Sequence, residues 1–118
     1  MRLNEVVYTD AKPVEGYSEE GFRVGGEIIR GHVLCGPTGT GEWQGWDDSA
    51  ALEALAGQVD VLFVGTGAEI AHMPAALRTR LEAAGLGVEV MATAPACRTY
   101  NVLLSEGRRI ALAALRVA

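Results

Sequence analysis

The stretch Val59–Met91, VDVLFVGTGAEIAHMPAALRTRLEAAGLGVEVM, contains two short apolar runs separated by an amphipathic segment. The runs VDVLFV and VEVM are rich in valine, which is typical of buried strands. The segment between them begins near Pro74 and ends at Gly85, and Leu77 and Leu81 recur at helical spacing. A strand, a helix and a second strand in this order form a right-handed crossover, so the two strands are predicted to be parallel.

The sequence after Met91 predicts one further helix and one further strand. Thr93 has the side chain of an N-cap for a helix from Ala94 to about Glu106, and Gly107 would end that helix. The next run, RRIALAAL, is rich in alanine and leucine and could be helical. We predict a strand there, because Gly107 has just ended a helix and few residues remain to bury another.

The sequence before Val59 predicts a β-rich half. Alternation in FRVGGEIIRGHVLC, residues 22–35, indicates an antiparallel hairpin or meander with one wet face. A glycine-rich loop with a short strand around Trp43 follows, and Asp47, Asp48 and Ser49 provide N-cap chemistry for a short helix. We therefore expect an α/β fold in a single domain over residues 17–118, preceded by a polar lead-in over residues 1–16.

Composition and charge argue against several classes of function. The chain has 118 residues, enough for one domain with a single core. Its net charge of −5 would repel a phosphate backbone, so we expect no nucleic-acid binding. No apolar run predicts a signal peptide or a transmembrane segment, so we expect a cytoplasmic protein. Cys35 and Cys97 are then expected to be free, buried thiols.

Two glycine-rich motifs resemble nucleotide-binding loops but lack a required residue. GTGAEI follows a strand as a dinucleotide fingerprint does, yet Ile70 stands where the third glycine belongs. GPTGTGEW has glycines at P-loop spacing, but Glu42 replaces the lysine. The histidines and cysteines have no metal-ligand spacing, so neither a metal nor a cofactor is predicted. The sequence predicts no catalytic residue.

One corner of the predicted fold carries enough polar residues to be a binding site. The strands ending at Val64 and Met91 are parallel, and ligands often bind outside the carboxyl ends of such strands. Thr66, Thr93, Arg98 and Asn101 would converge there, with Arg98 facing an anion.

Cys97 near the helix start would then be a candidate reactive thiol. The alternative is a structural joint in which Thr93 caps the helix and Tyr100 packs. In that case Arg98 and Asn101 bind loop carbonyls.

Three segments, FVGTGAEI, LEAAGLGVEVMATAPACRTYNVLLSEGRR and EGYSEEGFRVGGEIIRGHVL, together resemble a known family. It is a small α/β domain of unknown function found in bacteria and archaea, and it includes the mitochondrial complex I (NADH dehydrogenase alpha subcomplex) assembly factor 3. The resemblance covers Tyr17 to Leu115 and is most specific at Gly65–Gly67 and Ala96–Asn101. Ala92 stands where many relatives carry an acidic residue.

The resemblance implies a three-layer α/β/α fold with a mixed central sheet and an N-terminal antiparallel β-hairpin portion. It implies a non-enzymatic protein-interaction or assembly factor, cytoplasmic in bacteria and mitochondrial in eukaryotic relatives. Expected partners are respiratory complex I subunits or a second assembly factor, with the oligomeric state left open. The alternative is a small anionic-ligand-binding protein or enzyme. Under either reading, the candidate ligand or partner site consists of Gly65, Thr66, Gly67, Thr93, Cys97, Arg98, Tyr100 and Asn101.

Overall fold

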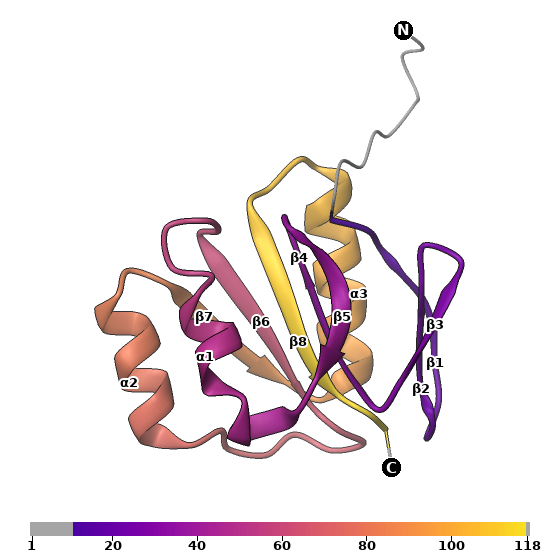
Figure 1. Ribbon diagram of the computed structural model, residues 1–118, viewed down its shortest axis with the longest axis horizontal. Helices are drawn as coiled ribbons and strands as arrows, with labels where there is room; N and C mark the ends of the chain where they lie inside the picture. Colours follow the sequence, from indigo (N-terminus) through magenta and orange to yellow (C-terminus); the bar gives the residue numbers. More distant parts are fainter. Residues whose placement is uncertain (1–10, 118) are drawn as a thin grey trace, which may run out of the picture.

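A five-stranded mixed sheet forms the centre of the computed structural model, which describes residues 11–117 (Figure 1). Its strands lie in the order β5-β4-β8-β6-β7. β6 pairs in parallel with β7 and with β8, whereas β4 is antiparallel to both β8 and β5. The bounds are β4 (His32–Gly36), β5 (Gly39–Trp43), β6 (Val61–Thr66), β7 (Gly87–Met91) and β8 (Ile110–Leu115).

A second sheet precedes the central one in the chain. It contains β1 (Val14–Tyr17), β2 (Gly21–Val24) and β3 (Glu27–Arg30), all antiparallel. This is the predicted N-terminal β-hairpin portion with one additional strand. β1 begins at Val14, inside the segment that was expected to be a polar lead-in. Val14 is buried and pairs with Val24, so the chain is already part of the fold there. Residues 1–10 of the expected lead-in lie outside the described residues.

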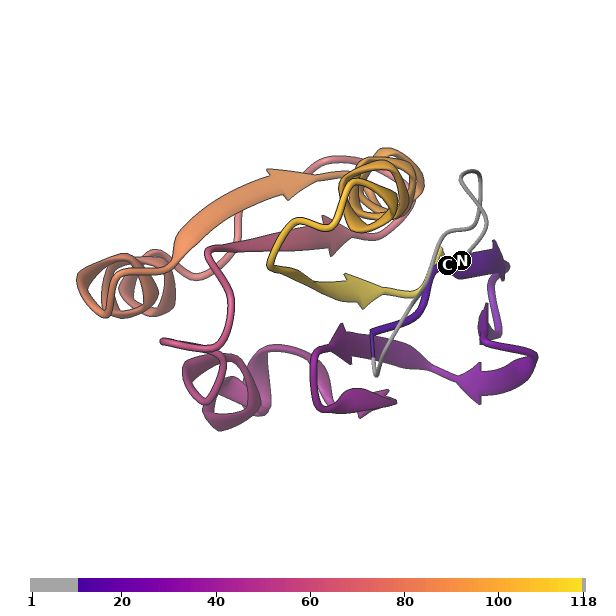
Figure 2. The ribbon, with the colours of Figure 1, turned by 90° about the horizontal axis from the view of Figure 1, so that it is seen from above.

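The helices cover both faces of the central sheet. They are α1 (Ser49–Glu53), preceded by the short 3-10 helix η1 (Gly45–Asp47), then α2 (Ala75–Ala83) and α3 (Thr93–Ser105). Figure 2 shows α1 and α3 on opposite sides of the sheet. α2 lies with α1 over one buried cluster, and α3 packs with the small sheet over the other. The three-layer arrangement and the mixed sheet are therefore confirmed.

Burial on both faces explains why the central strands read as continuous apolar runs. Leu62 and Val64 of β6 belong to the cluster under α1 and α2, whereas Phe63 between them belongs to the cluster under α3. β8 divides in the same way, with Ala113 on the first side and Leu112 on the second. The run RRIALAAL is therefore a strand, as predicted, because alternate residues fill two separate cores.

Two helices on opposite faces of the sheet connect its parallel strands. β6 reaches β7 through α2, and β7 reaches β8 through α3, so all three strands point the same way. Their carboxyl ends consequently meet at one edge of the sheet. The predicted parallel pair is confirmed. Two helix starts differ from expectation: Ala92 is the N-cap of α3, where Thr93 was predicted, and Asp48 at α1 makes no side-chain capping bond.

Candidate functional site

The buried hydroxyl of Thr93 joins three elements at the carboxyl ends of the parallel strands. Its Oγ1 accepts a hydrogen bond from the Gly67 N–H at 2.8 Å and donates to the Leu115 carbonyl at 2.6 Å. The Thr93 N–H also donates to the Gly67 carbonyl at 2.8 Å. One side chain thus links the end of β6, the end of β8 and the start of α3. Thr93 is fully buried, and its bond with the Gly67 N–H is buried as well, whereas its bond to the Leu115 carbonyl is partly buried.

Gly65 makes this close approach possible. A Cβ atom at position 65 would lie 2.9 Å from the Thr93 Cα and 3.2 Å from the Ala114 Cβ, which is too close for an unshifted backbone. Gly67 has a φ of +100°, a backbone conformation that residues other than glycine rarely adopt. The GTG motif therefore serves helix–strand contact rather than a nucleotide. This agrees with its incomplete match to the dinucleotide fingerprint.

Thr66 shapes the loop that follows β6. Its hydroxyl lies 2.8 Å from the Glu69 carbonyl and 3.1 Å from the Met91 carbonyl, and its one proton serves both. The same oxygen accepts from the Ala71 N–H at 3.0 Å. Thr66 thereby ties its own loop to the end of β7. The hydroxyls of Thr66 and Thr93 both lie at the carboxyl ends of the parallel strands, and each is already bonded to main-chain groups.

Asn101 and Tyr100 form a second joint, between α3 and the small sheet. The Asn101 amide donates to the Val14 carbonyl at 2.8 Å, and its Oδ1 accepts from the Val14 N–H at 2.8 Å. Asn101 thus makes the two hydrogen bonds to Val14 that a residue on a neighbouring strand would make. The buried Tyr100 hydroxyl donates to the Lys12 carbonyl at 2.9 Å. These two side chains therefore hold the N-terminal sheet against the rest of the domain.

We expect Asn101→Ala to lower the free energy of unfolding by about 1–2 kcal/mol, because two partly buried backbone groups of Val14 lose their partner. Amide hydrogen exchange at Val14 should become faster, while exchange within β6 and β8 changes little. Urea unfolding and NMR-detected exchange measure the two effects. Val102→Ala is the matched control, because Val102 is an exposed residue on the same helix. Unchanged exchange at Val14 would show that Asn101 does not hold β1.

Cys97 is buried rather than presented to solvent. Burial raises the pKa of its thiol to about 12, although the neighbouring Arg98 acts in the opposite direction. Loss of hydration thus outweighs the cation and the helix start that suggested a reactive thiol. Cys35 on β4 is also buried and free, and burial likewise raises its pKa to about 12. Both cysteines belong to the cluster beneath α3 and the small sheet.

We expect the native Cys97 thiol to resist alkylation at neutral pH. A pKa raised from 9.0 to about 12 lowers its thiolate fraction about a thousandfold, because each pKa unit is a factor of ten. The folded state also keeps its proton when the unfolded state has lost it. Stability from this thiol is therefore complete below pH 9 and declines as pH rises toward 12, by up to about 1.4 kcal/mol per pH unit.

The measurements are the rate of iodoacetamide modification, and urea unfolding at pH 8 and pH 10. Cys97→Ala is the control for the second experiment, since it should show a shallower loss of stability at high pH. Rapid alkylation at pH 7, with a plateau below pH 9, would instead identify a reactive thiolate.

Arg98 lies on the exposed side of α3, about 140° around the helix axis from Thr93. Its guanidinium makes no hydrogen bond or ion pair with any residue among 11–117. The expected convergence of Thr66, Thr93, Arg98 and Asn101 is thus incomplete. The two threonines lie at the same edge of the sheet but bind separate main-chain groups, Asn101 bonds to β1, and Arg98 faces solvent. Spacing along α3 could not reveal this, because the position of the small sheet decides which helix face is covered.

Ala92, where the family resemblance led us to expect an acidic residue, is the N-cap of α3. It has extended backbone angles, φ −61° and ψ 157°, and makes no side-chain capping bond. An acidic residue there would accept from the Ala94 N–H, since Pro95 has none. We expect Ala92→Asp to stabilise the protein by about 0.5–1 kcal/mol, measured by urea unfolding. Ala92→Asn should give part of this gain, and a loss with both variants would contradict the capping role.

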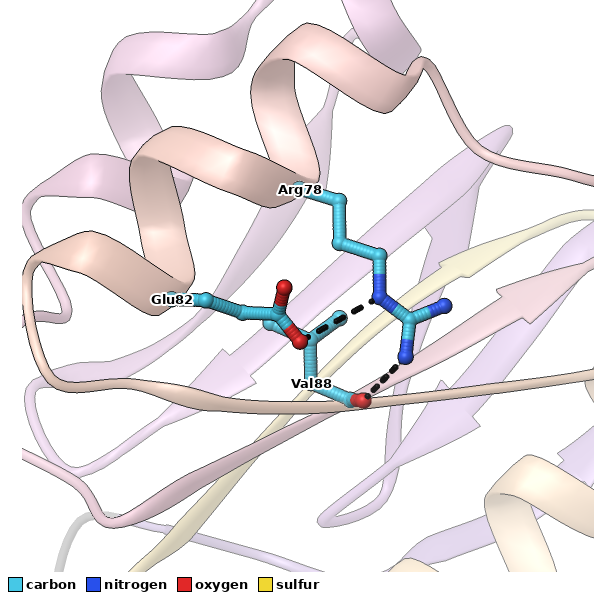
Figure 3. Close-up of polar contacts among 3 residues, drawn as sticks. All are labelled: Arg78, Glu82 and Val88. Carbon is cyan, nitrogen blue, oxygen red and sulfur yellow. Dashed lines mark hydrogen bonds and ion pairs between the residues drawn. The ribbon is translucent and has the colours of Figure 1, made fainter.

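A groove of about 530 Å³, which the sequence did not predict, lies between β7, the start of α2 and the loop before it. Arg78 of α2 lines it, and its guanidinium donates to the Val88 carbonyl at 3.1 Å and pairs with Glu82 at 3.4 Å (Figure 3). The available signal was Ile70, a large apolar residue in an otherwise small and polar loop, which is 69% exposed.

Among residues 11–117, His, Cys, Asp and Glu side chains form no group of three that could bind a metal ion. Nor does any helix in that range have the length and apolar character needed to cross a membrane.

The fold and its two joints define a small mixed α/β domain. The chain belongs to the family described as "Protein of unknown function (DUF498/DUF598)", which matches residues 14–115. An uncharacterised protein of Rhodobacter capsulatus is 50% identical over 98% of this chain and 93% of its own length. The NADH dehydrogenase [ubiquinone] 1 alpha subcomplex assembly factor 3 of Danio rerio is 34% identical, with 86% of this chain and 62% of that protein covered. The chain therefore spans less than two thirds of the assembly factor.

Solved structures agree with this assignment. A crystal structure described as an outer membrane protein from Bartonella henselae has a TM-score of 0.84 and 32% identity, covering 92% of this chain and 97% of that one. The solution structure of a Mth938-like domain from Bordetella pertussis has a TM-score of 0.77 and 26% identity, covering 100% and 94%. The resemblance to the assembly factor 3 family is confirmed.

Proposed function

We propose that this chain is a non-enzymatic protein-interaction domain that acts during assembly of respiratory complex I. The observation that carries the proposal is the 34% identity to complex I assembly factor 3 of Danio rerio over 86% of the chain. The expected partners are complex I subunits or a second assembly factor. Cytoplasmic action in a bacterial cell is part of the proposal and follows from the family resemblance.

The geometry of the motif residues is compatible with a scaffold role. Thr66, Thr93, Tyr100 and Asn101 each bind main-chain groups that belong to other elements. Side chains used in this way fix the fold and have little capacity left for a substrate. Partner recognition would then depend on exposed surfaces that these joints hold in place.

The test is affinity capture of the tagged full chain from its native cells, combined with deletion of its gene. We expect complex I subunits or a second assembly factor among the captured proteins. The deletion strain should contain less assembled complex I, measured by native gel electrophoresis. A tagged protein of similar size and charge from another family is the control bait. Failure to capture any such protein, together with normal complex I in the deletion strain, would overturn the proposal.

A further inference from the structure

The outer edge of β7 has open hydrogen-bonding positions. β7 is an edge strand of the central sheet, and among residues 11–117 it pairs only with β6. The Gly87 N–H donates to the Asp60 carbonyl at 2.9 Å, so residues 87, 89 and 91 direct their main-chain groups toward β6. Val88 and Val90 therefore direct theirs outward. Such an edge is a template for another strand unless the protein covers it.

The protein covers only part of this edge. The outward Val88 carbonyl accepts from the Arg78 guanidinium, whose Nε also faces Glu82 (Figure 3). Neither the N–H nor the carbonyl of Val90 has a hydrogen-bond partner within residues 11–117. Val90 is thus the one position of this strand where both outward groups are available. In an antiparallel pair, two such groups belong to a single pair of facing residues.

An apolar groove lies directly beside Val90. It has a volume of about 530 Å³ and is lined by Ile70, Ala71, His72, Met73, Ala75, Arg78 and Val90. Arg78 is the only arginine or lysine among these residues, and none of them is acidic. The whole chain carries a net charge of −5, whereas the groove is lined by the cation Arg78, whose Nε pairs with Glu82 outside the lining and whose Nη1 has no hydrogen-bond partner within residues 11–117. A segment that is apolar and acidic would complement it.

We propose that the β7 edge binds an extended segment of a partner protein as an added antiparallel strand. The main chain of that segment pairs with Val90, an apolar side chain enters the groove beside Ile70, and a carboxylate faces Arg78. This mode of recognition obtains affinity from main-chain hydrogen bonds and specificity from alternate side chains. The inference rests on the proposed function only in taking the partner to be a protein.

A second copy of the chain fits the same edge poorly. If two β7 strands paired with Val88 opposite Val90, the Glu89 side chains would face each other, and like charges in that position are destabilising. If Val90 instead faced Val90 of the second copy, Val88 would lie opposite Ala92, where the chain turns into α3. Two chains of net charge −5 also repel one another.

The experiment uses the full chain and a phage-displayed library of random linear peptides. Enriched peptides should alternate apolar residues with at least one acidic residue. Each synthesised peptide is then added to labelled protein, and amide hydrogen exchange is followed by NMR. We expect exchange at the Val90 N–H to slow at least about tenfold, because a peptide carbonyl now accepts its proton.

Arg78→Glu should weaken binding of the enriched peptides at least about tenfold, because the new glutamate would repel the acidic residue of the peptide. Arg80→Glu is the matched control. Arg80 lies on the same helix and is similarly exposed, but it pairs with Glu53 away from the groove. Binding by the Arg80 variant should match that of the unmodified chain within about twofold, which is the size of a surface charge effect.

Three results of the peptide experiment would overturn the inference. The first is a library without enriched peptides, and the second is enriched peptides that leave Val90 exchange unchanged. The third is slow Val90 exchange without peptide that depends on protein concentration, which would indicate a second copy at this edge. If capture recovers complex I subunits equally with the unmodified chain and Arg78→Glu, this inference fails and the proposed function stands. Peptide binding at the edge without capture of complex I subunits would support this inference and contradict the proposed function.

Discussion

Replacement of Thr93 by valine should lower the free energy of unfolding by about 2–4 kcal/mol. Valine has nearly the shape of threonine but cannot accept from the Gly67 N–H or donate to the Leu115 carbonyl. The buried Gly67 N–H and the partly buried Leu115 carbonyl would both lose their partner, and each such loss is typically worth about 1–3 kcal/mol. Urea unfolding followed by circular dichroism measures the change.

Thr93→Ser separates the hydroxyl from the methyl group. Serine can make both hydrogen bonds, so its loss should be only about 1 kcal/mol, the value for one buried methyl. The Gly67 amide should exchange faster in the valine variant than in the serine variant. Equal destabilisation by the two substitutions would mean that packing, and not the hydroxyl, determines the role of Thr93.

Gly65→Ala should lower the free energy of unfolding by about 1–3 kcal/mol. The added Cβ would lie 2.9 Å from the Thr93 Cα, so α3 must move away from β6 to accept it. That movement would also lengthen the hydrogen bonds of Thr93. We therefore expect the alanine variant to show lower stability together with faster amide exchange at Gly67, both measured on the same samples.

Gly41→Ala is the matched control for this substitution. Gly41 lies within β5, and a Cβ atom there would have no other atom within 4 Å. Its backbone has no positive φ, so alanine should change stability by no more than about 0.5–1 kcal/mol. If Gly65→Ala were as mild as Gly41→Ala, close approach of α3 to β6 would not require glycine.

The regular elements were predictable because local patterns determine them. The apolar runs of β6 and β7 and the helical spacing of Leu77 and Leu81 were visible in local sequence patterns. The terminal strand β8 was predicted because Gly107 ends the preceding helix and few residues remain to bury another. The parallel arrangement followed from the order of these elements. Predicted strand and helix ends differ from the structure by a few residues, since end positions depend on turn geometry.

The features that were not predicted depend on contacts distant in sequence. β1 begins at Val14 because Asn101, 87 residues later, pairs with its main chain. Thr93 became a buried link and not a cap, because Gly65 allows its hydroxyl to reach Leu115. Cys97 was judged by its helix position, but burial under the small sheet dominates its pKa.

These contacts change the meaning of the most specific motif residues. Gly65 and Gly67 with Thr93 bind the carboxyl ends of the strands to α3, and Tyr100 with Asn101 binds α3 to the small sheet. A short motif can therefore be characteristic of a family because it holds two sheets on one helix. The surface that we propose for recognition lies elsewhere, at the β7 edge and its groove.

Amide hydrogen exchange of Gly67 and Val14 in the purified chain, without any added ligand, tests the central claim most directly. If the two joints are internal, both amides should be protected at least about a hundredfold relative to an unstructured peptide. Addition of small anionic metabolites should leave those rates unchanged. Unprotected exchange at Gly67 that slows only when an anion is added would contradict the account and identify the corner as a ligand site.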